Sequence, residues 1–358
     1  MTQLLRVILV VAFAAIVLAI AYVVVTDPGS GTDVTARGHR APVQAHVGHA
    51  VKLGRGRAVM ASGPAGLWVA RQPPTGSPGE VERIDTATGK PGHAYQINIL
   101  PEGIAVGHGV IWVLGTKHAH GPATLLRIDP SSGRVQHRLQ LAEQPSCATA
   151  RFAASCYPVA TDDGVWVPLV DAIVHVNRSG TMADQRVPVN GHVWDLTGSF
   201  GQLWALAETA IYRITESTGA SLRIGLKKKV GVGVQSNHVT ADGHSVWVSS
   251  YPRDTTTNPG RLTRINPGEP PQVTVSRIYP GAGALALVDG GLWVARFDGQ
   301  GELDRLNGAT GTLTGPFLSM PDDPLVLVQR GDGLWVLSYR STGNVRTVTK
   351  VTLTPAAK

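Results

Sequence analysis

Two cysteines are the most reactive side chains in this sequence of 358 residues, and they lie nine positions apart as Cys147 and Cys156. Cysteines at this spacing can close a small loop as a disulfide in an oxidising compartment. A zinc site needs more ligands than these two, and no histidine lies between them. The pair therefore predicts a structural disulfide, with two free thiols as the alternative.

Five further residues are candidates for a ligand-binding site: Glu102, Tyr157, Trp194, Asn237 and His238. A carboxylate or a histidine can act as a general base, and tryptophan offers a large ring to a ligand. We select these five because they hold similar positions in the repeat described below. The alternatives are a packed aromatic for Trp194, a turn histidine bonded to backbone for His238 and a solvated loop acid for Glu102.

Metal-binding and catalytic motifs are otherwise weak. Asp298, Glu302 and Asp304 form an acidic cluster, but their spacing matches no calcium loop and is more typical of a solvated hairpin. The sequence contains no serine nucleophile elbow, no phosphate-binding glycine loop and no zinc spacing. We therefore expect no cofactor; Mg²⁺ or Ca²⁺ is the alternative if the protein is an enzyme.

The elements that must position these residues follow from an internal repeat. A phrase of glycine, one or more small or apolar residues, tryptophan and another apolar residue occurs seven times, every 38 to 54 residues. It uses seven of the eight tryptophans, so we assign these to packing within the repeats. They are Trp68, Trp112, Trp166, Trp204, Trp247, Trp293 and Trp335.

A second phrase follows each tryptophan, as in Arg83-Ile84-Asp85 with Gly89. The acidic or amide side chain can cap its own turn and the glycine can adopt a positive φ, so the phrase predicts a hairpin between two strands. Each unit then contains four strands in about 44 residues, which is the size of one propeller blade. The sequence predicts an all-β, seven-bladed β-propeller over residues 49–358.

The ends of the repeat region predict how the ring closes. After Lys350-Val351-Thr352 the chain has no room for a fourth strand, whereas a spare strand at about His49 to Gly54 precedes the first unit. We expect this N-terminal strand to pair with the C-terminal strand of the last unit. A spacing ten residues longer than average between the second and third tryptophans contains both cysteines, so the disulfide should staple that insertion.

The N-terminal segment predicts a membrane anchor. Nineteen consecutive apolar residues, from Val7 to Val25, are long enough to cross a bilayer. Arg6 precedes the run and Asp27 follows it, so residues 1–6 should be cytoplasmic and the rest extracytoplasmic. A cleaved signal peptide is the alternative. Residues 26–48, rich in glycine and poor in large apolar groups, read as a flexible stalk.

Composition limits the classes of partner. Glycine and proline are abundant, charged residues make up 16% of the chain, and the net charge is +7. Lysine and arginine are scattered, without a basic stripe and interleaved aromatic residues, so we expect no nucleic acid partner. The excess positive charge suits an anionic partner such as lipid headgroups or a cell-wall polymer.

The alternation of Gly-x-Leu-Trp-Val with Arg-Ile-Asp-x-x-Thr-Gly resembles the virginiamycin B lyase-like group of propellers and, more loosely, NHL and YVTN-type repeat proteins. The resemblance spans about residues 50 to 355 and implies the propeller fold. It also implies either an extracytoplasmic binding or sensor module or a lyase whose histidines and Mg²⁺ lie on inner-strand loops. The lyase phrase Pro-His-Gly-Ile corresponds here to Pro101-Glu102-Gly103-Ile104, with Glu102 in place of the histidine.

These observations favour a membrane-anchored, extracytoplasmic module that binds a ligand or a protein of the cell envelope. Propeller loops at the central channel bring groups from different blades together, which suits recognition. A lyase-like or hydrolytic enzyme that uses a divalent metal is the alternative, and a structural spacer in an envelope complex is a third hypothesis.

Overall fold

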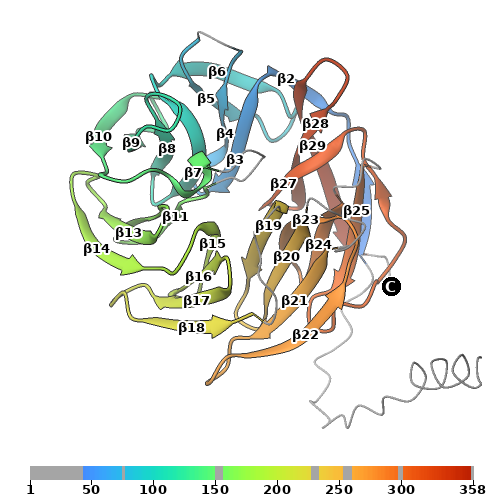
Figure 1. Ribbon diagram of the computed structural model, residues 1–358. Helices are drawn as coiled ribbons and strands as arrows, with labels where there is room; N and C mark the ends of the chain where they lie inside the picture. The colour runs from blue at the N-terminus through green and yellow to red at the C-terminus, as the bar shows by residue number, and fades with distance from the viewer. Residues whose placement is uncertain are drawn as a thin grey trace, which may run out of the picture. The chain divides into compact units, whose positions relative to one another are not determined.

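The computed structural model describes residues 43–74, 77–149, 156–226, 234–252, 260–296 and 301–355. Their strands form seven antiparallel sheets that stand as blades around a common centre (Figure 1). In blades 1 to 6, successive strands run outward from the centre, so that each blade is one stretch of sequence. The predicted seven-bladed β-propeller is confirmed.

The connection between blades 2 and 3 contains the 3₁₀ turn η1 (Ser146–Thr149). Blade 1 contains β3 (Arg57–Gly63), β4 (Gly66–Gln72), β5 (Glu80–Ile84) and β6 (Pro91–Gln96). Blade 2 contains β7 (Leu100–Gly107), β8 (Val110–Thr116), β9 (Ala123–Ile128) and β10 (Val135–Gln140). Blade 3 contains β11 (Val159–Ala160), β12 (Gly164–Pro168), β13 (Ala172–Asn177) and β14 (Ala183–Pro188).

The remaining blades follow the same order. Blade 4 contains β15 (Val193–Ser199), β16 (Gln202–Ala207), β17 (Ala210–Thr215) and β18 (Ser221–Gly225). Blade 5 contains β19 (Val234–Ala241), β20 (Val246–Pro252), β21 (Arg261–Asn266) and β22 (Gln272–Ile278). Blade 6 contains β23 (Ala282–Val288), β24 (Gly291–Arg296), β25 (Glu302–Asn307) and β26 (Leu318–Ser319).

Blade 7 joins the two ends of the ring. From the centre outward it contains β27 (Asp323–Arg330), β28 (Gly333–Arg340) and β29 (Val345–Pro355). The N-terminal strands β1 (Val43–Val47) and β2 (Val51–Arg55) both pair with β29. The pairing of β2 runs antiparallel, from Arg55 opposite Val345 to Val51 opposite Val348. Because β1 belongs to the sheet, the propeller begins at Val43, inside the range that the sequence analysis assigned to the stalk.

Burial of the strands explains the tryptophan repeat. Every residue of β8 is buried, whereas the outer strand β14 is largely exposed. A strand covered on both faces by neighbouring blades reads as a continuous apolar run. Each of the seven repeat tryptophans is at most 2% exposed. All seven lie in an apolar cluster shared with the following blade. Trp68, for example, packs with Ile104 of β7, and Trp335 packs with Met60 of blade 1.

The hairpins between the third and fourth strands have the predicted chemistry. Asp85 Oδ1 accepts hydrogen bonds from the backbone N–H groups of Ala87 and Thr88, at 2.9 and 2.8 Å. Gly89 follows with a φ of 74°, which L side chains rarely adopt. The side chain therefore caps its own turn, and the glycine reverses the chain.

The predicted membrane segment, Val7 to Val25, lies outside the described residues. Within the part of the chain that is described, no helix has the length and apolar character to span a bilayer. The acidic residue Asp298 and the anchor-flanking residues Arg6 and Asp27 also lie outside the described ranges.

Candidate functional site

The two faces of the propeller differ in the loops that they carry. Because four antiparallel strands return to their starting end, the connections between successive blades all lie at the end where the inner strands begin. We call this end the connection face; it includes residues 97–99, 189–192 and 320–322. The opposite end, the turn face, carries the hairpins between first and second strands and between third and fourth strands.

A central cavity of about 350 Å³ follows the axis, and the inner strands of all seven blades line it. Most of the residues that line it are apolar, including Met60, Ile104, Leu196 and Leu327, and polar atoms supply about half of its exposed surface. A volume of several hundred Å³ with a few polar groups in an apolar wall is typical of small-molecule sites. The cavity is therefore the first candidate for a ligand site.

A histidine and a carboxylate from neighbouring blades form the charged part of the cavity. Asp195 on β15 is 6% exposed, and its Oδ2 lies 3.4 Å from Nδ1 of His238 on β19. The same oxygen accepts a hydrogen bond of 2.9 Å from the backbone N–H of Val239. Asp195 thus joins the inner strands of blades 4 and 5 and holds the His238 ring at the cavity wall.

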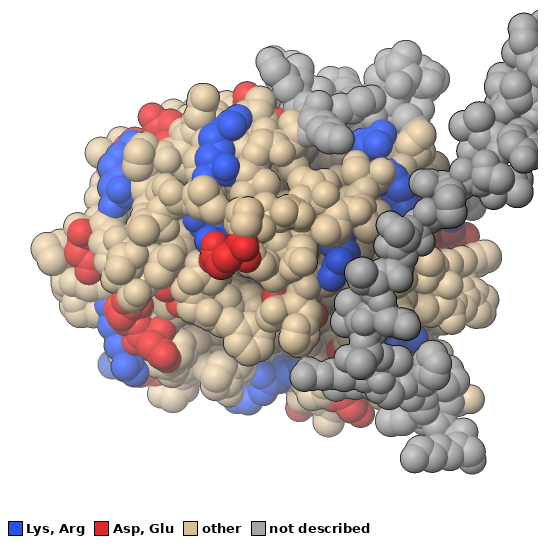
Figure 2. Space-filling view, turned by 90° about the horizontal axis from the view of Figure 1, so that it is seen from below, with Lys and Arg blue, Asp and Glu red and all other residues tan. Residues whose placement is uncertain are grey.

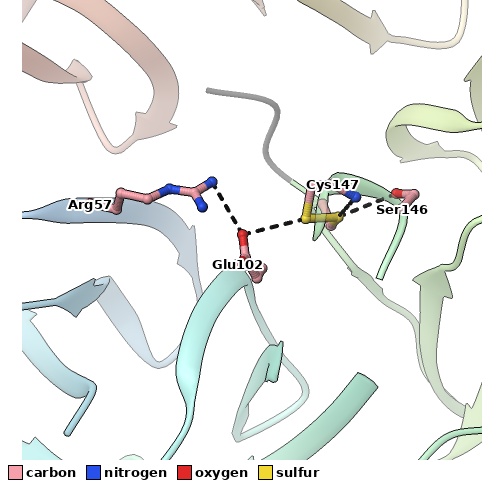
Figure 3. Close-up of a disulfide and its surroundings, with 5 residues drawn as sticks. Arg57, Glu102, Ser146 and Cys147 are labelled. Atoms are coloured by element: carbon pink, nitrogen blue, oxygen red, sulfur yellow. Dashed lines mark hydrogen bonds and ion pairs between the residues drawn. A yellow bond between two sulfur atoms is a disulfide. The ribbon is translucent and has the colours of Figure 1, made fainter. Parts of the chain in front are cut away.

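Glu102 lies outside the cavity lining, in a buried contact between an arginine and the disulfide (Figure 3). Its Oε2 is 3.1 Å from Nη2 of Arg57 and 3.7 Å from Sγ of Cys147. Burial raises the pKa of the Glu102 carboxyl, and the guanidinium of Arg57 lowers it to a smaller extent. Glu102 therefore links the start of blade 1 to the long connection between blades 2 and 3.

The predicted disulfide is confirmed. Cys147 and Cys156 are joined at 2.02 Å between sulfur atoms, with their Cα atoms 5.5 Å apart. Both residues are buried, and the Oγ of Ser146 lies 3.2 Å from the Cys156 sulfur. The bridge closes the long connection that enters β11, where the extended tryptophan spacing placed it.

A recurrent β-bulge explains why Glu102 and Trp194 hold equivalent positions. Pro101 and Gly103 pair with consecutive residues of β8, so Glu102 is the extra residue of a bulge. Trp194 is the extra residue between Val193 and Asp195 in the same way. A bulge turns one side chain away from the regular alternation of the strand. It takes both side chains out of the cavity lining.

The five predicted site residues are thus divided. Tyr157 and His238 line the cavity, whereas Glu102 and Trp194 do not. The ring of Trp194 packs with the Trp204 cluster and lies 6.0 Å from the ring of His192. Asn237 pairs through its backbone with Ser250 in β20, and its side chain lies outside the described part of the structure.

Asp195 is the site residue that the sequence reasoning missed. It is an acidic residue in an otherwise largely apolar inner strand, β15, and this is the signal that could have identified it. Its partner His238 comes from the next blade, so no short sequence pattern contains both residues. The pairing follows from the position of the two strands side by side in the ring.

Two carboxylates of the acidic cluster have protein partners. Glu302 accepts a hydrogen bond of 2.7 Å from Arg296, and Asp304 accepts one from the hydroxyl of Tyr279. Among the described residues, no three histidine, cysteine or acidic side chains lie close enough to hold a metal ion together.

Comparison with known proteins identifies the fold. No protein-family profile matches this sequence, and no curated protein matches it either. The β-propeller domain of Cps50 (Swd1) from Myceliophteria thermophila is similar with a TM-score of 0.60 and 10% identity, over 86% of this chain and all of that domain. Hydrazine synthase of Kuenenia stuttgartiensis is similar with a TM-score of 0.60 and 13% identity, over 84% of this chain and 95% of that one. At such identities the similarity shows a shared propeller fold, and function must be argued from the site.

Proposed function

We propose that this protein is a membrane-anchored, extracytoplasmic binding module whose central cavity accepts a ligand from the connection face. The observation that carries the proposal is the 350 Å³ cavity with the Asp195–His238 pair in an apolar wall. The ligand is an apolar group of small-molecule size with one polar function. That function exchanges hydrogen bonds with His238, while the apolar part contacts side chains such as Leu196 and Leu327.

The rigidity of the wall supports recognition. Inner strands of seven blades hold the cavity, and Asp195 fixes two of them to each other through Val239. A site whose groups are held in place before binding loses less conformational entropy when the ligand arrives. The propeller fold itself is compatible with a binding or scaffold role.

Two features support an extracytoplasmic position. The apolar run from Val7 to Val25, with Arg6 before it, has the length and charge pattern of a signal anchor. The buried disulfide between Cys147 and Cys156 suits an oxidising compartment. The outer surface seen in Figure 2 carries basic and acidic side chains interspersed on a mainly uncharged background.

The binding role is tested with the full chain purified in detergent. A library of small amphipathic compounds is screened by thermal shift, and the hits are titrated by calorimetry. We expect binding to weaken at least about tenfold in His238→Ala and Asp195→Asn. His137→Ala, which removes an exposed histidine from the outer strand β10, is the matched control and should bind normally. Equal affinity in all four proteins would refute the cavity as the site.

The membrane position has its own test. Membranes that contain the full chain are washed with alkaline carbonate, and a protease is added from the extracytoplasmic side. We expect the chain to remain in the membrane after the wash. We also expect the protease to cut the propeller, because the proposal places it on the side from which the protease is added. Release by carbonate would contradict the anchor without affecting the cavity.

A lyase-like activity is the second candidate, and the Asp195–His238 pair is the observation that favours it. A histidine held by a carboxylate can take a proton from a substrate and return it to a leaving group. In this case calorimetric titration of Mg²⁺ or Ca²⁺ into the full chain should show heat of binding, and the Asp195→Asn variant should show none. Ligand binding that is independent of both ions would leave the binding module as the sole role of the cavity.

A further inference from the structure

Each blade carries one cationic residue at the same position of the repeat, so the surroundings of these seven residues can be compared with one another. The third strand carries an arginine, histidine or lysine at the position of Arg213 in blade 4. Within the described residues, six of these seven cations have partners. Arg127 donates to the backbone oxygen of Arg178, for example, and Lys350 Nζ lies 3.0 Å from Asp332. The cation is thus normally satisfied by the protein itself.

Blade 4 shows what a carboxylate does at this position. Arg213 Nη1 lies 2.6 Å from Oε1 of Glu269, and Nη2 lies 3.0 Å from Oε2, so the two groups form a bidentate pair. Glu269 belongs to the hairpin between the third and fourth strands of the next blade. The guanidinium and carboxylate planes match in this geometry, which is the strong form of an arginine ion pair.

Arg83 is the exception. It is the equivalent residue of blade 1 and is exposed, and it forms no hydrogen bond or ion pair with the described part of the chain. Its Nε lies 2.9 Å from the place that a Cβ of Gly66 would occupy, so the side chain lies across that glycine. The charge is therefore held against the surface without a hydrogen-bond or ion-pair partner among the described residues.

The sequence register explains the missing partner. Arg264-Ile265-Asn266 of blade 5 aligns with Arg127-Ile128-Asp129 of blade 2, and the third residue after each phrase is Glu269 and Ser132, respectively. The hairpin of blade 2 lines the groove beside Arg83 with Pro130 and Ser131 and carries Ser132 at the sequence position of Glu269, so it has no carboxylate where blade 5 has one. The short serine side chain supplies no charge.

An open groove surrounds Arg83. It has a volume of about 510 Å³ and lies between blades 1 and 2 on the turn face. The corresponding groove beside Arg213 measures about 410 Å³ and contains the Glu269 side chain. Both grooves share a repeat tryptophan, the arginine and a proline of the neighbouring hairpin. The groove at Arg83 is further lined by His93 and Tyr95, whose rings are 4.7 Å apart in an edge arrangement.

The acidic residue of the groove, Asp85, forms no ion pair with Arg83 within the described part of the chain. Asp85 Oδ1 accepts the backbone N–H groups of Thr88 and Ala87. These hydrogen bonds, led by that of Thr88, lower the pKa of the Asp85 carboxyl, and Arg83 contributes less. Asp85 is thus committed to its own turn.

We propose that the groove between blades 1 and 2 binds an acidic peptide segment of a partner protein, with a glutamate side chain of the partner paired to Arg83. A peptide is favoured because the equivalent occupant at Arg213 is a glutamate in the turn Asn266-Pro267-Gly268-Glu269, whose Pro267 oxygen also accepts a hydrogen bond from the arginine. The exposed His93 ring, and the part of the Tyr95 ring that Gly133 does not cover, offer surfaces against which the peptide backbone packs. This site is on the face opposite the connections, so it is independent of the proposed cavity function.

The test uses the full chain and a fluorescent peptide, acetyl-Gly-Glu-Pro-Gly-Glu-Pro-amide, with a peptide that has glutamine for glutamate as the reference. Polarisation should show binding of the glutamate peptide alone. Arg83→Gln should weaken it at least about tenfold. Ser132→Glu should weaken it similarly, because the new carboxylate pairs with Arg83 from within the chain. Arg138→Gln, an exposed arginine of β10, is the matched control and should bind as the unchanged protein does.

A further variant tests whether the same site can be created in another blade. Glu269→Ser removes the internal carboxylate from Arg213 and should add a second binding site, which raises the stoichiometry from one peptide to two. Unchanged binding in Arg83→Gln or in Ser132→Glu would overturn the proposal. Binding of oligoglucuronate in preference to the glutamate peptide would also overturn it, because the ligand would then be an acidic glycan.

Discussion

The indole Nε1 of Trp247 in blade 5 donates a 2.7 Å hydrogen bond to the backbone oxygen of Gly308 in blade 6. Gly311 of the same hairpin stands so close that a Cβ there would lie 2.5 Å from Cη2 of the Trp247 ring. Gly89 lies against Trp335 and Gly180 against Trp112 in the same way, so at these three junctions the tryptophan of one blade receives the hairpin glycine of the next. This contact holds neighbouring blades at a set spacing around the ring.

Loss of that hydrogen bond should destabilise the propeller. In Trp247→Phe the Gly308 oxygen loses its indole donor, and we expect a loss of about 2 to 3 kcal/mol in the free energy of unfolding. Trp166→Phe is the matched control, because the Trp166 N–H has no hydrogen-bond partner in the described part of the chain. Urea unfolding should show a cost about 1 kcal/mol smaller for the control. Equal costs would mean that the indole hydrogen bond contributes nothing.

The close approach of Gly311 to Trp247 leads to a second pair of variants. Gly311→Ala should cost about 1 kcal/mol for its positive φ of 71° and more for the collision with the ring. Gly331→Ala has a φ of 59° and nothing within 4 Å of the added carbon, so it should cost only the backbone part. Thermal unfolding compares the two, and a larger shift in Gly331→Ala would contradict the packing argument.

Buried Glu102 should give the propeller a pH-dependent weakness. A carboxyl whose pKa is raised by folding is less favourable when ionised in the folded than in the unfolded chain, so stability falls as pH rises through the raised pKa. Glu102→Gln removes the charge, while the half-exposed Arg57 remains hydrated. At pH 8 we expect its melting temperature to exceed that of the unchanged protein by about 2 °C, and at pH 3.5 to show no gain. A lower melting temperature at pH 8 would show that the Arg57 pair outweighs burial.

Asp129 should have the opposite dependence. Hydrogen bonds from Ser131 and Ser132 lower the pKa of its carboxyl from 3.8 to about 2. The stability that this ionised group contributes is present above pH 3.8 and is lost as pH falls through about 2. Asp129→Ala should therefore melt below the unchanged protein at pH 6, and the gap should close toward pH 2. A gap that is constant across this range would assign the effect to the turn backbone instead.

Ring closure depends on β1 and β2. A chain that lacks residues 1–55 loses the two N-terminal strands that pair with β29, including the hydrogen bond of 2.9 Å from the Gly48 N–H to the Lys350 oxygen, and keeps the pairing of β29 with β28. We expect it to unfold at least about 10 °C lower, or to aggregate through the exposed strand edge. A chain that lacks residues 1–42 keeps both strands and should melt as the full chain does. Similar melting of both truncations would show that blade 7 is stable without them.

The number of blades, the hairpins and the closing strand were predictable from the sequence alone. Each depends on residues that recur at a regular spacing or lie a few positions apart, such as Asp85 and Gly89 around one turn. A strand that is buried on both faces needs apolar residues at every position, and the tryptophan phrase shows such a run within a few consecutive residues. The disulfide was predictable for the same reason, since its two cysteines are near each other in the chain.

Which side chains meet at each candidate site depends on the closure of the ring, which places residues of different blades side by side. Asp195 meets His238 and Glu102 meets Arg57, and Arg83 lines a groove with the blade 2 hairpin at Pro130 and Ser131; in each case the groups come from different blades. Their distances depend on how the blades pack, and on bulges that redirect single side chains such as Trp194. Periodicity identifies which positions repeat, but a repeat position carries no information about the side chain that the next blade places against it.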